Sequence, residues 1–545
     1  MSFVVSSRNV AFIFIVIICS VNLRAQLPVN VSDEQNRRQT DDLTAQGISA
    51  FQSGEMEKAR QLLEQALRKD PKNSEAHTFL GILDDNAGNF ESAEKHFAAA
   101  VRLVPDSASA RNNHGAILLR LNRRAQAKSE FEASLKIDPD QPNALVNLAQ
   151  IFFAEDTPQS LRAALNLFEK ADSIAPDAAV ARSLVIIALK LKEKEKTSEF
   201  YRNYALRLEK SDEIKPDADS RAELGGALYE AGLLAEAEAE LKAALDSDPS
   251  NSDTIARLGR VYLARDDISS AGKTLETAVA RGYSTAAIYS LLAVVYEKIG
   301  RYDNAIPAMR LAINLEPESE KYRFQYGLLL TNAEAPAAAL IRIDEALKTF
   351  PNSSRLWLAR GIAELKSGKN NDAAKSINHA IELDPDFAQA YAYLGLVRVQ
   401  IGQFNVAIEL YEKALQKDPT LSAIHQMIAD VMLQQTDADN RRIESELKKS
   451  IASDPTFTLS YLALGKLYIR MSRWNEAVEY LEKTVKLEPD LAEAYYQLGR
   501  VYARLKRKDE SAEALDKFKT LSETQKKESD TQLRELVKRL ANVRF

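Results

Sequence analysis

The stretch AQAYAYLGLVRVQIGQFNVAIELYEKALQKDPTL, residues 388–421, carries the signals from which the fold of this chain can be predicted. Its apolar residues recur at spacings of three and four, the period of a helix with one buried face. Gly402 interrupts this pattern, because a residue just past a helix end often takes a left-handed backbone conformation that glycine adopts at little cost. A second apolar run, residues 404–416, ends at Asp418 and Pro419, since proline disfavours the helical conformation of the residue before it. The stretch therefore predicts two helices joined by a tight turn.

The same signals return along the chain at a fixed interval. Twelve prolines mark the ends of successive repeats, and six of the eleven gaps between them are equal to the gap from Pro385 to Pro419. Small residues form two further series in phase with these prolines, where small side chains let the two helices of a repeat approach closely. The clearest members of both series are Gly81, Gly225, Gly259, Gly327, Gly361, Gly395, Gly465 and Gly499 in first helices, and Ala93, Ala237, Ala407 and Ala477 in second helices. This regularity predicts one array of stacked helix pairs rather than several globular domains.

This pattern resembles the tetratricopeptide repeat, and AYYQLGRVY at residues 494–502 is similar to that family's first helix almost throughout. The resemblance extends from about Thr40 to Thr520. It implies an all-α, right-handed superhelical solenoid of about 14 helix-turn-helix repeats. The pattern is less regular between residues 142 and 218, where the loop at 155–160 is expected to be longer.

The segment 1–25 has the features of a signal peptide. Arg8 supplies a positive start, residues 10–19 form an unbroken apolar run, and Ala25 offers a small residue for cleavage. A run of this length is too short to span a bilayer comfortably, because a spanning helix needs about 20 residues. We therefore expect an extracytoplasmic protein, periplasmic or secreted, without a membrane span after cleavage. Retention as an uncleaved N-terminal membrane anchor is the alternative, with lipidation at Cys19 as a further one.

These observations divide the chain into six predicted segments. They are a signal peptide at 1–25, a flexible lead-in at 26–39, regular repeats at 40–141, irregular repeats at 142–218, regular repeats at 219–525 and a C-terminal capping helix at 526–545. A polar cap is expected because the last repeat of an array exposes an apolar face.

Composition and motifs indicate a binding protein. The formal net charge of −6 is the wrong sign for a nucleic-acid partner, which requires a basic surface. The sequence contains no GxSxG, HExxH or Walker-type motif, and its five histidines show no metal-ligand spacing. We therefore expect no enzymatic activity, no cofactor and no metal.

The family resemblance implies that first helices line a concave groove that binds proteins or peptides. Reading the groove side of each first helix gives an apolar set and a basic set. The apolar set is Phe324, Leu328, Leu358, Ile362, Leu365, Ala392, Leu396 and Val399, and the basic set is Lys466, Arg470, Arg500 and Arg504. The alternative is that the apolar side chains pack between neighbouring first helices and that the basic groups are solvated or bridged to nearby acids.

Three functional hypotheses follow. The first is an exported scaffold that binds partner proteins along the groove, and the alternative is a structural component of an envelope export or surface-polymer assembly. The third is a regulatory subunit of a separate enzyme. The carboxylate clamp of this family combines Lys, Asn and Arg over three first helices. Only the fragments Asn112, Asn113 and Asn147 match it, so recognition of chaperone tails is not expected.

Overall fold

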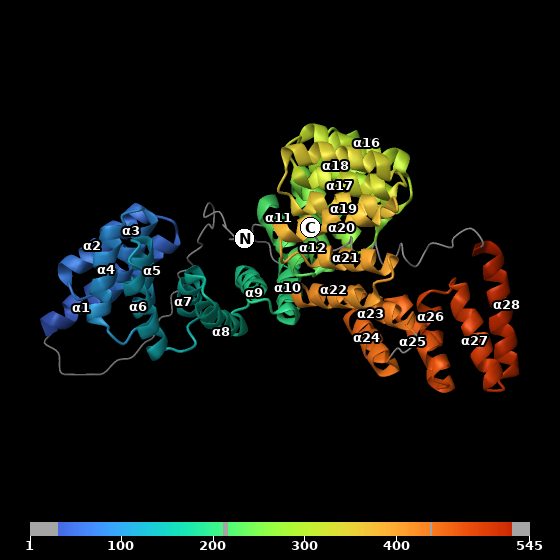
Figure 1. Ribbon diagram of the computed structural model, residues 1–545. Coiled ribbons are helices and arrows are strands. Elements are labelled where there is room, and N and C mark those ends of the chain that lie inside the picture. The colour runs from blue at the N-terminus through green and yellow to red at the C-terminus, as the bar shows by residue number, and fades with distance from the viewer. Residues whose placement is uncertain (1–30, 211–215, 436–438, 526–545) are drawn as a thin grey trace. The chain divides into compact units, whose positions relative to one another are not determined.

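The computed structural model describes residues 31–210, 216–435 and 439–525 (Figure 1). Every helix or strand assigned in these ranges is an α-helix, and there are 28 of them. The chain divides into two compact units, which follow each other in sequence at Arg265 and Asp266. The predicted signal peptide and the predicted capping helix lie outside the described residues.

The first unit contains helices α1 to α13. Their bounds are α1 Val31–Gln52, α2 Met56–Lys69, α3 Ser74–Asn86, α4 Phe90–Leu103, α5 Ala108–Arg120, α6 Arg124–Ile137, α7 Pro142–Glu155, α8 Pro158–Ile174, α9 Ala178–Lys190, α10 Lys194–Lys210, α11 Ala218–Glu230, α12 Leu234–Ser247 and α13 Ser252–Ala264. From α1 to α12, each odd-numbered helix packs against the next even-numbered one. These pairs are the predicted helix-turn-helix repeats.

The second unit contains helices α14 to α28. Their bounds are α14 Ile268–Ala280, α15 Ala286–Lys298, α16 Tyr302–Leu315, α17 Glu320–Asn332, α18 Pro336–Thr349, α19 Ser354–Lys366, α20 Asn370–Leu383, α21 Ala388–Gln400, α22 Phe404–Lys417, α23 Ser422–Leu433, α24 Asn440–Ser453, α25 Thr458–Arg470, α26 Trp474–Leu487, α27 Ala492–Arg504 and α28 Lys508–Gln525. Pairing again runs from α15–α16 to α27–α28, and each second helix packs on the first helix of the next repeat. The predicted all-α solenoid is confirmed.

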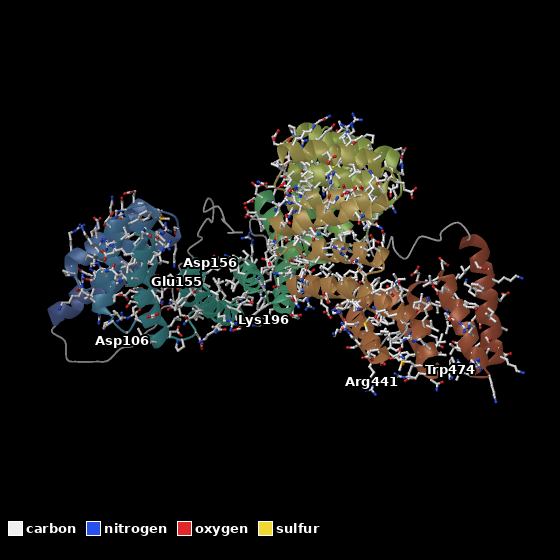
Figure 2. The ribbon with its side chains drawn as sticks, in the orientation of Figure 1. Asp106, Glu155, Asp156, Lys196, Arg441 and Trp474 are labelled. Carbon is white, nitrogen blue, oxygen red and sulfur yellow. The ribbon has the colours of Figure 1, made fainter. Side chains whose placement is uncertain are left out.

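The turns within repeats depend on one left-handed residue. Gly402 has φ 77°, and the N–H of Gln403 donates to the carbonyl of Arg398 across the turn at 2.8 Å. Residues other than glycine hold this conformation elsewhere, among them Asn122 at φ 58° and Asp156, which is labelled in Figure 2, at φ 52°. Asparagine and aspartate tolerate it best among non-glycine residues, and Lys192, Glu334, Ser472 and Lys506 also adopt it, so these turns do not require glycine.

The two helices of a repeat meet at the small residue of the first helix. A Cβ atom at position 395 would lie 2.4 Å from Cε1 of Tyr411, and one at position 81 would lie 2.8 Å from Cε1 of Phe97. In both repeats the aromatic residue follows the glycine by sixteen positions. Where alanine replaces the glycine, as at Ala149, the residue sixteen positions later has no ring. In other repeats the glycine faces an aliphatic side chain, as Gly225 faces Leu241, so the close approach of the two helices does not depend on a ring.

Two segments differ from the sequence-based expectation. The expected long loop at 155–160 is short, because Thr157 caps α8 and Pro158 begins it, so that the extra residues lengthen α8 to 17 residues. Residues 31–39 of the predicted flexible lead-in belong to α1, and they contain no proline or glycine that would stop a helix. Among the described residues, no helix combines the length and the apolar character needed to cross a membrane.

Candidate functional site

The predicted apolar set lies on α17, α19 and α21, and most of it is buried. Phe324, Leu358, Ile362, Ala392 and Leu396 are between 0% and 8% exposed. They are buried because first helices of successive repeats pack on each other, as α17 does on α19 and α19 on α21. The three partly exposed members are Leu328, Leu365 and Val399. The apolar surface open to a partner is therefore narrower than the helical pattern alone predicts.

The predicted basic set lies on α25 and α27. Arg470, Arg500 and Arg504 are exposed, whereas Lys466 is partly exposed and forms an ion pair with Glu493. No carboxylate of the described residues lies within ion-pair distance of the three guanidinium groups. The neighbours of two of them are neutral: Arg470 donates to the side-chain oxygen of Asn440, and Arg500 to Gln497 at 3.2 Å.

Aromatic rings accompany two of these arginines. The guanidinium carbon of Arg500 lies 5.6 Å from the centroid of the Tyr496 ring, and that of Arg504 lies 6.0 Å from the centroid of the Trp474 ring. Tyr496 is 39% exposed. A cation held near an aromatic face keeps its hydrogen-bond donors available to a ligand. This arrangement suits an anionic group such as a carboxylate.

An acid that the sequence analysis did not single out stands between the two sets. Asp430, on α23, follows Leu396 by one repeat length and so takes the same place in its repeat. Gln426 is 2% exposed, and its amide nitrogen donates to Oδ1 of Asp430 at 2.8 Å. Burial raises the pKa of Asp430 to about 6. The sequence could have indicated this site, because Asp430 is an aspartate at a position that is apolar in the three preceding repeats, as Leu328, Ile362 and Leu396.

We expect Asp430→Asn to stabilise the protein at pH 7.5. The folded-state pKa of Asp430 is raised from 3.8 to about 6, so folding favours the protonated carboxyl, and stability falls as the pH rises through this range. At about 1.4 kcal/mol per pKa unit, the gain from removing the charge is up to about 3 kcal/mol at pH 7.5. Urea unfolding of both proteins at pH 7.5 and pH 4 measures it.

The difference between the two proteins should largely disappear at pH 4. As a control, Asp372→Asn removes a carboxylate that is 54% exposed and should change stability by less than about 0.5 kcal/mol. An equal effect of Asp430→Asn at both pH values would contradict the interpretation.

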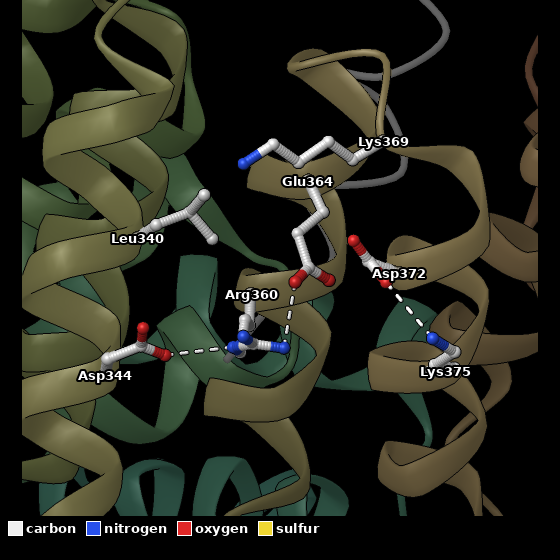
Figure 3. Close-up of a pocket in the computed structure, with 7 residues that line it drawn as sticks. All are labelled: Leu340, Asp344, Arg360, Glu364, Lys369, Asp372 and Lys375. Atoms are coloured by element: carbon white, nitrogen blue, oxygen red, sulfur yellow. Dashed lines mark hydrogen bonds and ion pairs between the residues drawn. The ribbon is translucent and has the colours of Figure 1, made fainter.

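A separate cavity of about 370 Å³ lies between α18, α19 and α20 (Figure 3). Arg360 is the centre of its polar lining, since it donates to Asp344 at 2.9 Å and to Glu364 at 2.8 Å. Ser376 donates to the second oxygen of Glu364 at 2.6 Å. The lining contains three acidic and three basic side chains. With its central arginine engaged by two carboxylates, this cluster is best interpreted as a structural ion network.

Two histidines that appeared unrelated in the sequence are neighbours in the fold. Nδ1 of His77 on α3 lies 3.0 Å from Nδ1 of His96 on α4. Burial and the proximity of His77 lower the pKa of His96. In the part of the chain that the structure describes, no group of three or more potential metal ligands comes together.

Comparison with family models shows to which protein family the chain belongs. Models described as tetratricopeptide repeat match residues 50–113 and 217–295, residues 358–422 and 462–525, and residues 108–141 and 286–319. Together these matches span more than half of the chain. It is a tetratricopeptide-repeat protein. Proteins with such repeats are typically non-enzymatic scaffolds for protein interactions.

Several solved structures are similar to this chain. Yeast Tom70 is 17% identical and covers 87% of this chain and 100% of its own, with a TM-score of 0.39. The APC/C hetero-tetramer Cut9–Hcn1 is 13% identical, covering 92% and 96%, with a TM-score of 0.37. YrrB, described as a tetratricopeptide-repeat protein with an unusual peptide-binding site, is 23% identical over 32% of this chain and 90% of its own, with a TM-score of 0.27. No curated protein matches.

Proposed function

We propose that this tetratricopeptide-repeat protein is an exported interaction scaffold that binds an acidic segment of a partner protein at the repeats α25–α26 and α27–α28. The observation that carries the proposal is the set of exposed arginines on two successive first helices, Arg470, Arg500 and Arg504, for which no carboxylate of the described residues is a partner. Arginine presents a planar fork of donors that matches a carboxylate. The partly exposed Leu365 and Val399 supply apolar contacts further along the groove.

Export is proposed from the segment 1–25 alone, through its positive start, short apolar run and small residue at position 25. It places the partner outside the cytoplasm. A scaffold and a fixed component of an envelope assembly differ in how they hold their partners, because an assembly retains stoichiometric companions whereas a scaffold releases varied ones.

The test is cross-linking of the tagged chain in intact cells, followed by mass determination of its N-terminus and of the cross-linked partners. We expect the triple variant Arg470→Gln, Arg500→Gln, Arg504→Gln to lose at least about tenfold in partner recovery, since several charge-assisted hydrogen bonds are removed together. Recovery by the unaltered chain should also fall as salt rises, because exposed charges are screened.

The matched control removes three exposed arginines from second helices, namely Arg68→Gln, Arg342→Gln and Arg441→Gln. This control carries the same net charge as the test variant and should keep its partners. Equal losses in both variants would show that net charge and not this surface matters. A mature N-terminus at Gln26 is expected, and an intact Met1 would contradict cleavage.

A further inference from the structure

We infer that Asp430 is the receptor for a cationic side chain of the bound partner, either a lysine ammonium or an arginine guanidinium. This inference rests on the proposed function, because it names a second chemical group of the same partner segment. The argument starts from the place of Asp430 in the repeat.

Asp430 belongs to a series of equivalent positions on successive first helices. Leu328, Ile362, Leu396 and Asp430 follow one another at one repeat length, and Lys466 comes next in a repeat that is longer by two positions. The helix of Asp430, α23, packs against α25, which carries Lys466 and Arg470. In this series Asp430 therefore lies between the apolar residues that precede it and the basic residue Lys466 that follows it.

The carboxylate of Asp430 has no ion-pair partner among the described residues. Its one hydrogen bond there comes from Gln426, which fixes Oδ1 and acts as a positioning residue. Lys466 is close enough to lower the pKa of Asp430, but its ammonium group forms its ion pair with Glu493. The side chain of Asp430 is only partly exposed. An acceptor for a positive donor is therefore left open at this place.

Other buried acids of this chain have a cation beside them. The pairs are Asp84 with Arg60 at 2.7 Å, Glu240 with Arg221 at 3.5 Å, Glu364 with Arg360 at 2.8 Å and Glu446 with Lys449 at 2.8 Å. A charge removed from water is costly unless it is paired, which accounts for these pairings. Asp430, which is only partly exposed, differs from them in having no ion-pair partner among the described residues, and burial raises the pKa of its carboxyl. Such perturbed groups concentrate at functional sites.

The spacing of the helices gives the partner a sequence pattern. Packed helices lie about 8–10 Å apart, and an extended chain advances about 3.3 Å per residue. One repeat therefore corresponds to about three partner residues. If a basic residue of the partner contacts Asp430, acidic residues of the partner about three and six positions away from it would contact Arg470 on α25 and Arg500 on α27.

Selection of random dodecapeptides displayed on phage tests the inference without knowledge of the natural partner. The full chain, its Asp430→Asn variant and its Arg500→Gln, Arg504→Gln variant are each used as bait, with thermal unfolding recorded to show that all three are folded. We expect peptides selected by the unaltered chain to combine Lys or Arg with Asp or Glu at a fixed offset. Peptides selected by Asp430→Asn should lose at least about fivefold of the Lys and Arg enrichment while keeping the acidic residues.

The two proposals fail separately in this experiment. The inference on Asp430 is overturned if the selected peptides are enriched in acidic residues but not in Lys or Arg. It is also overturned if peptides selected by Asp430→Asn keep their Lys and Arg enrichment. Neither result contradicts the proposed binding of acidic residues by the arginines. Basic enrichment that depends on Asp430, without acidic residues, overturns the proposed acidic partner only. Failure of the unaltered chain to select any peptide family overturns both.

Discussion

Replacing Arg360 with leucine is expected to destabilise the second unit by about 3 kcal/mol. The substitution leaves the carboxylate of Glu364, whose side chain is 4% exposed, without its cation. Breaking a buried ion pair by removing one partner typically costs about 3–5 kcal/mol, and the partial exposure of Arg360, 29%, places this case at the lower end. The opposite substitution, Glu364→Leu, should cost less, because Arg360 keeps Asp344 at 2.9 Å and contact with water.

The double variant Arg360→Leu, Glu364→Leu is the control for this prediction. Neighbouring repeats already carry leucine at the equivalent places, Leu394 and Leu330, which are 4% and 5% exposed. Replacing a buried pair by apolar residues of similar volume is often neutral or stabilising. The double variant should therefore recover most of the stability that Arg360→Leu loses.

The chain supplies a local reporter for this measurement. It contains two tryptophans, and one of them, Trp357, stands on α19 one turn before Arg360. In a Trp474→Phe background, Trp357 is the one remaining tryptophan, so urea unfolding followed by tryptophan fluorescence reports on the surroundings of α19. A double variant as unstable as the single one would show that the ion network is not the cause.

Replacing Gly395 with leucine is expected to lower the stability of its repeat by about 3 kcal/mol. The first added carbon would lie 2.4 Å from Cε1 and 2.7 Å from Cδ1 of Tyr411, whose side chain is 1% exposed and has no open space to move into. Overpacking a core typically costs about 1–3 kcal/mol, and a full isobutyl group against a buried ring lies at the upper end. Thermal and urea unfolding measure the loss.

Removing the ring should partly restore the repeat. Tyr411→Ala alone leaves a cavity and should cost about 3–5 kcal/mol. In the double variant the leucine occupies space that the ring has vacated, so the combined loss should be smaller than the sum of the two by about 1–3 kcal/mol. Strict additivity of the two losses would indicate that Gly395 and Tyr411 do not meet, and the helix pairing within this repeat would then be wrong.

The sequence by itself determined the helices and their pairing. Apolar spacing within residues 388–421, the stop at Gly402 and Pro419, and the return of these signals at a constant interval specify helix pairs that stack. Each of these signals acts within one or two turns of helix, so a reader of the sequence can evaluate it without knowing the rest of the chain. The error at residues 155–160 was also local. Thr157 caps α8 and Pro158 begins it, and a segment with these two signals belongs to a longer helix and not to a longer loop.

Only the tertiary structure decided which side chains of the groove remain available. Leu358 and Ile362 share a helical face with Leu365, yet the first two are buried and the third is partly exposed. The fold also brought His77 to His96 and left Asp430 without an ion-pair partner among the described residues. The physical reason is that exposure and pairing depend on residues contributed by other helices, often a whole repeat away, and the pattern within one helix contains no information about them.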